Sequence, residues 1–213
     1  MKKILLPLMI IFLSACSLTM NESPRQKVSA FLDSYKNQDS TVLSQLEETI
    51  NNEYTNDDYR QRYKTLMTNQ YKNMAYEIKD EQIEGDNAVV EVEITVYDYA
   101  SAIRKANDYL NSNPDIFKKS NPTIDMEDAK DETTKDISDS NNQEEKEKNI
   151  TQSADLELDE DKFMEYKLTQ MESVNDMVKY TIEFTLTKTD GKWKIDPLSN
   201  ADIEKLHGIY NQD

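Results

Sequence analysis

Cysteine, histidine and glycine are all scarce in this 213-residue chain, and each shortage removes a class of function. Cys16 is the only cysteine, so no disulfide framework can stabilise the fold. His207 is the only histidine, so no histidine-based metal cluster can form, and no second cysteine is there to join it. The three glycines, Gly85, Gly191 and Gly208, are too few for a glycine-rich loop that cradles phosphate.

Basic side chains are also in short supply, with 25 Lys and Arg against 42 Asp and Glu and a formal net charge of −17. Affinity for nucleic acid comes from Lys and Arg side chains that displace counterions from phosphates. The acidic balance therefore excludes nucleic acid as a partner. It also repels anionic lipid headgroups, although salt screens this repulsion within about 8 Å.

What the chain does have at its start is an apolar run. Lys2 and Lys3 precede residues 4–13, which are apolar and interrupted only by Pro7. Two small residues then lead to Cys16, and this order is typical of a secretory signal with a small-residue cleavage site. The run is too short for a transmembrane helix, which needs about 20 apolar residues.

The sequence Leu13-Ser14-Ala15-Cys16 resembles the lipobox of bacterial lipoproteins. The resemblance implies a signal peptide over residues 1–15, cleavage after Ala15, and a lipid on Cys16 that anchors the chain to the outer side of the cell membrane. A diacylglyceryl group supplies the two acyl chains that stable anchoring needs. The alternatives are an ordinary cleaved signal, which leaves the position of the cysteine a coincidence, and a buried core helix, which leaves the two lysines unexplained.

Removing residues 1–15 takes Lys2 and Lys3 from the 25 basic side chains and no acids, which leaves 23 against 42 and a formal charge of −19. Residues 16–23 are then the lipidated cysteine and a short polar tether, and residues 24–213 form a single domain. Apolar residues at helical spacing predict six helices. The first begins at Pro24, and the others extend over 41–51, 57–74, 100–111, 160–174 and 201–210. Alternating apolar residues predict two hairpins, with strands over 76–84 and 90–96 and over 178–187 and 193–195.

Residues 120–155 differ in composition from both flanks, because Asp, Glu, Ser, Asn, Thr and Lys dominate and apolar residues are few. Such a segment cannot bury enough apolar area to offset the entropy of ordering its backbone. We predict a disordered acidic insertion within one domain, which either contacts a basic partner or is a passive spacer.

Segregated helices and antiparallel strands predict an α+β fold in which N-terminal helices pack on a curved antiparallel sheet of about four strands. Two stretches carry a resemblance to the cone-shaped NTF2-like (cystatin-like) domain of many small Gram-positive lipoproteins of unknown function. They are Pro24-x3-Val28-x2-Phe31-Leu32-x2-Tyr35-x3-Asp39 and Asp190-Gly191-Lys192-Trp193-Lys194-Ile195. The resemblance implies the cone, and cone-shaped domains often enclose a pocket.

Tyrosine is abundant, with twelve residues, and its apolar ring with a polar tip suits the wall of a pocket. The candidate cavity residues are Tyr63, Tyr71, Tyr97, Asp98 and Tyr99, and ordinary core packing is the alternative. Asp98 beside phenols resembles the base and phenolic donor of ketosteroid-isomerase-type enzymes, as a fold-level analogy only.

The acidic side chains also raise a calcium hypothesis, because Asp155, Glu157, Asp159 and Asp161 alternate along the chain. An EF-hand loop needs glycine and glutamate at its sixth and twelfth positions, where this chain has Glu160 and Tyr166. These acids are therefore interpreted as a solvated flank of the insertion. We expect no metal and no cofactor, and His207 is expected to be structural or to cap a helix.

Three functions fit these features. The first is a non-enzymatic binding domain, anchored to the membrane through the lipid on Cys16, that contacts an unknown envelope protein or ligand outside the cytoplasm. The second is a small-molecule carrier or sensor with a tyrosine-lined cavity. The third is an isomerase-type enzyme that uses Asp98.

Overall fold

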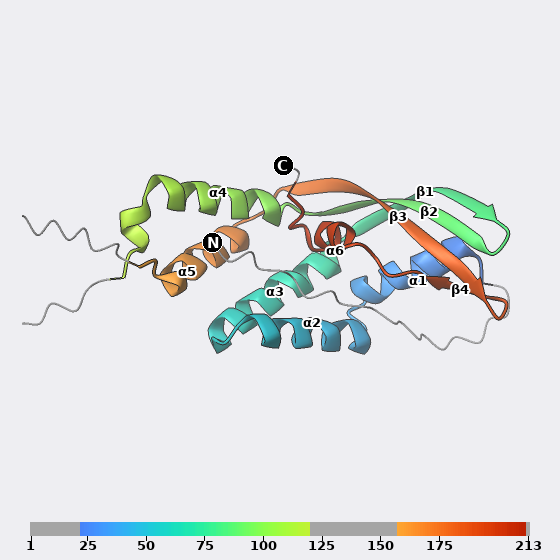
Figure 1. Cartoon of the computed structure of the whole chain (residues 1–213), viewed down its shortest axis with the longest axis horizontal. Helices are drawn as coiled ribbons and strands as arrows, with labels where there is room; N and C mark the ends of the chain where they lie inside the picture. The colour runs from blue at the N-terminus through green and yellow to red at the C-terminus, as the bar shows by residue number, and fades with distance from the viewer. Residues whose placement is uncertain (1–21, 120–156, 212–213) are drawn as a thin grey trace, which may run out of the picture.

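A computed structural model describes residues 22–119 and 157–211, which form an α+β arrangement (Figure 1). Its helices are α1 (Pro24–Lys36), α2 (Ser40–Glu53), α3 (Asp57–Asn73), α4 (Tyr99–Ser112), the short 3-10 helix η1 (Pro114–Phe117), α5 (Glu160–Glu172) and α6 (Asn200–His207). Its strands are β1 (Ala75–Glu84), β2 (Asn87–Tyr97), β3 (Met177–Thr189) and β4 (Lys192–Ile195). The expected signal peptide with Ala15 and Cys16 and the expected insertion at 120–155 lie outside the described residues.

The six helices and four strands expected from periodicity are confirmed, with small differences at their ends. Strand β2 begins at Asn87 and not at residue 90, and the last helix ends at His207 and not at residue 210. Gly208 has φ +69°, a left-handed conformation that ends the helix. Its N–H donates to the carbonyls of Glu204 and Lys205. At the other end of the domain, Ser23 begins α1 with a capping box that it shares with Gln26.

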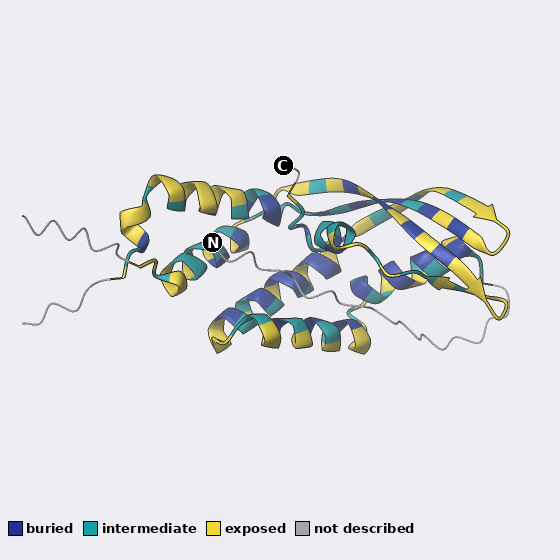
Figure 2. Ribbon diagram, in the orientation of Figure 1, coloured by how far each residue is buried: buried dark blue, intermediate teal, exposed yellow. Residues whose placement is uncertain are grey.

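The four strands form one open antiparallel sheet in the order β1-β2-β3-β4. Val92 lies opposite Ile182, and both are fully buried, whereas the neighbouring pair of Glu91 and Glu183 faces the polar side. One face of the sheet is therefore apolar and the other polar, as expected for an antiparallel sheet with one solvated face. Figure 2 shows this alternation of buried and exposed residues along the strands.

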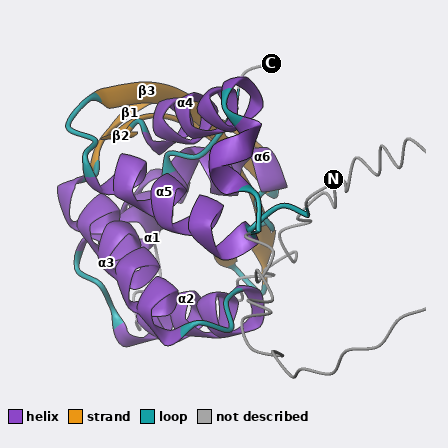
Figure 3. Cartoon of the chain, turned by 90° about the vertical axis from the view of Figure 1, so that its left-hand side faces the viewer, coloured by secondary structure: helices purple, strands orange, loops and turns teal. Residues whose placement is uncertain are grey.

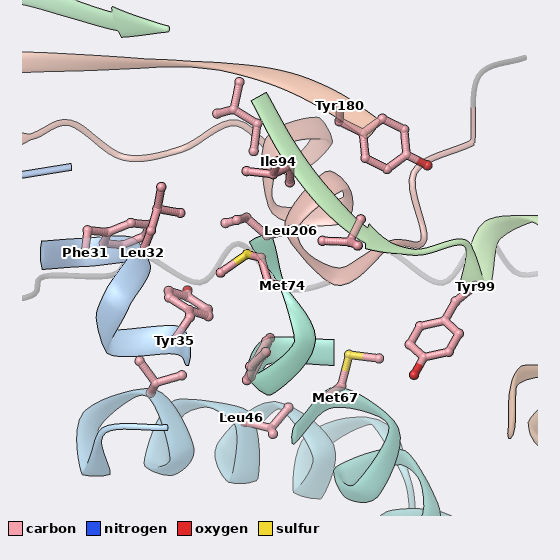
Figure 4. Packing of buried hydrophobic residues seen from close by; sticks show 14 of the residues in the cluster. Phe31, Leu32, Tyr35, Leu46, Met67, Met74, Ile94, Tyr99, Tyr180 and Leu206 are labelled. Carbon is pink, nitrogen blue, oxygen red and sulfur yellow. The ribbon is translucent and has the colours of Figure 1, made fainter. Parts of the chain in front are cut away.

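Helices cover the apolar face of the sheet in two layers. Helix α1 contacts β1, β2 and β4, α6 contacts β2 and β3, and α3 contacts β2. Helix α2 packs against α3, so the expectation that the N-terminal helices lie on the sheet is met by α1 and α3, with α2 one layer further out. In Figure 4, Leu46 comes from α2 and Met67 from α3, and Phe31 and Leu32 from α1 lie nearer the sheet.

Helices α4 and α5 form an antiparallel hairpin that projects beyond the end of the sheet (Figure 1). Helix α5 also contacts α3, and the end-on view shows α5 between α4 and α3 (Figure 3). At the tip, the Lys119 N–H donates to the Glu157 carbonyl at 2.9 Å and the Asp159 N–H donates to the Phe117 carbonyl at 2.7 Å. The chain therefore leaves for residues 120–156 and returns from them at one place, the end of the molecule opposite the two β-turns.

Three segments meet at the point where β2 becomes α4. The fully buried Gln70 accepts a hydrogen bond from the Tyr97 N–H at 2.8 Å and donates one to the Tyr97 carbonyl at 3.3 Å. Gly208 packs against both residues, and a Cβ on Gly208 would lie 2.1 Å from the Tyr97 oxygen and 2.2 Å from the Gln70 amide nitrogen. Only glycine fits there, and its carbonyl accepts the Ala100 N–H at 2.7 Å.

This close approach predicts that Gly208→Ala destabilises the fold more than Gly85→Ala. Gly85 has a similar positive φ of +62° with nothing within 4 Å of its missing Cβ, so Gly85→Ala carries only the left-handed penalty of about 1–2 kcal/mol. Gly208→Ala adds overpacking, which costs about 1–3 kcal/mol more. Urea denaturation followed by circular dichroism measures both free energies of unfolding, and equal losses would contradict the crowding at Gly208.

Candidate functional site

Two hollows flank helix α3, and together they account for four of the five expected cavity residues. Tyr97 and Tyr99 line the first hollow, and Tyr63 and Tyr71 line the second. Asp98 lines neither of them. The tyrosines therefore do not share the single cavity that the sequence suggests, because α3 lies between the two groups.

The first hollow, which we call the α3–α5 pocket, has a volume of about 240 Å³. Sites for drug-sized ligands measure about 300–1,000 Å³, so this pocket suits a smaller molecule. It is lined by Arg62, Thr65, Leu66 and Asn69 of α3, by Tyr97 at the end of β2 and Tyr99 at the start of α4, and by Met171 and Glu172 of α5 with Val174 just beyond it.

Arg62 joins the two helices that form the pocket. Its guanidinium binds Glu172 through two hydrogen bonds of 2.7 and 2.9 Å, and it also donates to Glu165 and Thr169. The hydrogen bonds with Glu172 hold the pKa of Arg62 above its ordinary value. Since Asp58 lies 3.8 Å away as well, one positive charge faces three carboxylates. Of these acids only Glu172 lines the pocket, and Asp58 and Glu165 add negative charge beside it, which favours a cationic ligand over an anionic one.

Tyr97 and Tyr99 form the aromatic wall of the α3–α5 pocket, with ring centres 5.9 Å apart and planes inclined by 31°. The Tyr99 hydroxyl donates to the Leu66 carbonyl at 3.2 Å, which fixes the ring against α3. Burial raises the pKa of Tyr99 to about 12, so its hydroxyl is protonated at neutral pH. The wall is thus a neutral, positioned aromatic surface.

Asp98 begins helix α4. Its carboxylate accepts a hydrogen bond from the Ser101 N–H at 2.9 Å, and its own N–H donates to the Asp176 carbonyl at 2.9 Å. The first contact is that of a helix N-cap, which stabilises a helix by about 1 kcal/mol. The base beside phenols that the isomerase analogy requires is therefore not assembled in either hollow.

The second hollow, the tyrosine–histidine hollow, measures about 30 Å³, which is room for a single water molecule. The Tyr71 hydroxyl lies 3.1 Å from His207 Nε2, and the Tyr35 and Tyr71 rings meet edge to face with centres 5.0 Å apart. Burial lowers the pKa of His207 to about 4 and raises those of Tyr35 and Tyr71. These groups are neutral near pH 7, which fits the expected structural role of His207.

Glu53 lies at the border of the tyrosine–histidine hollow and is a residue that the sequence does not single out. Its Oε1 is buried and has no hydrogen-bond partner within the described part of the chain. Burial raises the pKa of Glu53, and the charge of Lys167 from α5 partly opposes this shift. Burial in turn lowers the pKa of Lys167. Both pKa shifts favour the neutral forms, those of the Glu53 carboxyl group and the Lys167 amine, and the two residues come from distant parts of the sequence.

Two acidic side chains of the calcium hypothesis have other roles in the structure. Asp159 caps α5 by accepting the Lys162 N–H at 3.0 Å, and the Glu157 carboxylate lies 3.1 Å from the Lys119 ammonium. Among residues 22–119 and 157–211, no group of three or more His, Cys, Asp or Glu side chains is placed to hold a metal ion. In the same two ranges, no helix combines the length and the apolar character needed to cross a bilayer.

The buried neutral imidazole predicts a loss of stability in acid that depends on His207. Between about pH 6.5 and pH 4, the unfolded chain binds a proton at His207 that the folded chain does not, so the free energy of unfolding falls as the pH falls through this range. The contribution reaches about 3 kcal/mol near pH 4. His207→Gln keeps a polar group near Tyr71 without this titration, so urea denaturation at about pH 7 and pH 4.5 should show a smaller acid loss in the variant.

Glu53 has a raised pKa and therefore shifts stability in the opposite direction, but it is present in both proteins and its effect cancels in the comparison. An identical acid loss in the two proteins would show that His207 is not held neutral in the fold. Far-ultraviolet circular dichroism at about pH 7 provides the control, because both proteins should have the same helix content before denaturant is added.

No protein-family model, curated protein or solved structure matches this chain. No residue role can therefore be transferred to it from a known relative. The α3–α5 pocket, the Arg62 cluster and the N-terminal segment with Cys16 are the features from which a function can be inferred.

Proposed function

We propose that this chain is a lipid-anchored, extracytoplasmic binding domain of the cell envelope, and that its ligand occupies the α3–α5 pocket. The proposal of an anchor rests on the two lysines, the apolar run and Ala15-Cys16 at the start of the sequence. The proposal of binding rests on one observation above all, a pocket lined by Tyr97 and Tyr99 whose Arg62 is surrounded by three carboxylates.

The finer fold proposal is an NTF2-like cone. It is supported by a single antiparallel sheet with its apolar face covered by α1, α3 and α6, and by a pocket where β2 ends. A cone of this kind holds ligands between the sheet and the helices, which is where Tyr97 and Tyr99 meet Leu66 of α3. The fold provides the cavity, and the residues at the rim of the α3–α5 pocket determine which ligand binds.

The ligand class follows from the pocket's walls. Tyr97 and Val174 are partly exposed in the pocket, whereas Leu66, Met171 and Tyr99 are almost fully buried behind its surface, and the surplus of negative charge surrounds Arg62. A small cation suits this lining, because aromatic faces and carboxylates both attract cations. Transport or sensing of such a molecule at the membrane is the function that this site supports best.

Filling the pocket tests its role in binding. Asn69 is exposed at the lip of the α3–α5 pocket, whereas Lys72 is exposed on the same helix outside it. Native mass spectrometry of the protein purified from its own membranes should show a bound small molecule in the wild type and in Lys72→Trp, and none in Asn69→Trp. A ligand kept by Asn69→Trp would place the binding site elsewhere, and a wild type without ligand would contradict a carrier.

Replacing the cysteine tests the anchor. Cys16→Ser should move the protein from the membrane fraction to the soluble fraction of cells, because the acyl chains attach to the sulfur and each buried methylene contributes about 0.8 kcal/mol. Ser17→Ala is the matched control in the adjacent residue and should stay in the membrane fraction. Immunoblotting of the fractions measures the distribution, and retention of Cys16→Ser with the wild-type extraction profile would refute the lipid anchor.

A further inference from the structure

The first turn of α1 and the two β-turns lie together at one end of the molecule, which we call the turn end. The Arg25 N–H donates to Glu81 near the end of β1 at 2.8 Å, so α1 begins beside the turn between β1 and β2. The Lys188 N–H donates to the Asp86 carbonyl at 2.7 Å, so the β3–β4 hairpin lies beside that same turn. Figure 1 shows the turn end at the right and the α4–α5 tip at the left.

The dimensions of the elements separate these two ends widely. Strand β2 has 11 residues and spans about 35 Å, and α4 has 14 residues and adds about 20 Å in the same general direction. Seven residues separate Cys16 from Pro24, and this stretch reaches at most about 30 Å. An anchor at Cys16 therefore holds the turn end next to the bilayer, and the α4–α5 tip can touch the membrane only if the whole domain lies flat.

The distribution of charge opposes the flat orientation. The basic residues of the turn end are Arg25, Lys27, Lys188, Lys192 and Lys194, and its acidic residues are Glu22, Glu81, Glu84, Asp86, Asp190 and Asp196. Five basic against six acidic residues leave a formal charge of −1 there, so most of the formal charge of −19 carried beyond residue 15 lies on the rest of the chain. An anionic lipid surface therefore repels the long sides and the α4–α5 tip more strongly than it repels the turn end.

The β3–β4 hairpin also has the side chains that suit a lipid headgroup layer. Lys188, Lys192 and Lys194 are exposed, and the Lys188 ammonium lies 5.5 Å from the centre of the Trp193 ring, which is half-buried and packs against the edge of the core. On the neighbouring hairpin, Ile83 is 53% exposed. Tryptophan settles at membrane interfaces because it has an apolar ring with a polar N–H, and lysines beside it attract anionic lipids.

We propose that the turn end is a second membrane contact, in which the β3–β4 hairpin and Ile83 rest on the anionic outer surface of the membrane that holds Cys16. The domain then stands upright, and the α4–α5 tip points away from the bilayer. This inference rests on the lipid anchor proposed above. It differs from that proposal in assigning an orientation and a contact surface, which an anchored domain on a freely swinging tether would lack.

The orientation can be tested without relying on lipidation in cells. The protein from residue 16 to 213 retains every described helix and strand, and Cys16 is its only thiol, so it can be coupled to a maleimide lipid in vesicles. Trp193 is the only tryptophan and reports contact with the bilayer by fluorescence. In vesicles of phosphatidylglycerol and brominated phosphatidylcholine, we expect Trp193 emission to shift to shorter wavelength and to be quenched.

Matched variants separate the turn end from other surfaces. Lys192→Glu with Lys194→Glu should abolish the quenching, whereas Lys105→Glu with Lys162→Glu makes the same charge change on α4 and α5 and should leave it intact. Moving the reporter to the far tip, with Trp193→Phe and Tyr109→Trp, should give emission that brominated lipid does not quench. Circular dichroism confirms that each variant is folded.

Three results would overturn the inference: unquenched Trp193 in the coupled wild type, quenching that survives the Lys192 and Lys194 changes, or quenching of the reporter at Tyr109. The last result would mean that the domain lies flat. Because the maleimide lipid supplies the anchor, each outcome is independent of the fractionation of Cys16→Ser. The lipid anchor in cells and the orientation on the bilayer can therefore fail separately.

Discussion

The hydrogen bonds between Gln70 and the backbone of Tyr97 are the contact on which the rest of the arrangement depends. Gln70 is the one polar side chain of the described residues that is buried to the level of the apolar core, and its amide satisfies both the N–H and the carbonyl of Tyr97. An unsatisfied buried polar group costs about 1–3 kcal/mol, so both partners are held firmly. The contact fixes where β2 ends and how far α3 lies from it. The α3–α5 pocket lies beside this contact, since Tyr97 and Asn69 both line it.

Periodicity in the sequence predicts the helices and strands well because apolar spacing directly reflects which face of an element is buried. It does not say against what that face packs. Val42, Leu46 and Ile50 identify the buried stripe of α2, but the same stripe could lie on a sheet or on a helix, and only the structure shows that it lies on α3. The end of α6 was missed for a different reason. Tyr210 continues the apolar spacing, but Gly208 packs against Tyr97 and Gln70, and its left-handed conformation ends the helix before Tyr210.

In the candidate site as well, the sequence indicates which residues are of interest but does not show which of them the fold brings together. Composition directs attention to the twelve tyrosines, but six of them belong to the buried core: Tyr35, Tyr59, Tyr63, Tyr71, Tyr99 and Tyr180. Tyr63 and Tyr71 nevertheless lie on one side of α3, while Tyr97 and Tyr99 lie on the other, and no local spacing relates the two pairs. Arg62 could not be found at all from sequence, since its partners Glu165 and Glu172 lie 103 and 110 residues further along. Only the folding of α5 back onto α3 gives this arginine its role.

The length of the sheet determines how far the α3–α5 pocket lies from the turn end. The α3–α5 pocket lies where β2 ends, about 35 Å along the strand from the turn between β1 and β2. With the turn end resting on the bilayer, the hydrogen-bonded sheet, and not the short tether, sets the height of the pocket above the membrane. A flexible tether would let the pocket take any height within its reach, whereas a paired sheet keeps one distance. In the proposed orientation, the small net charge of the turn end allows contact with the lipid surface, and the acidic remainder of the chain keeps the pocket away from it.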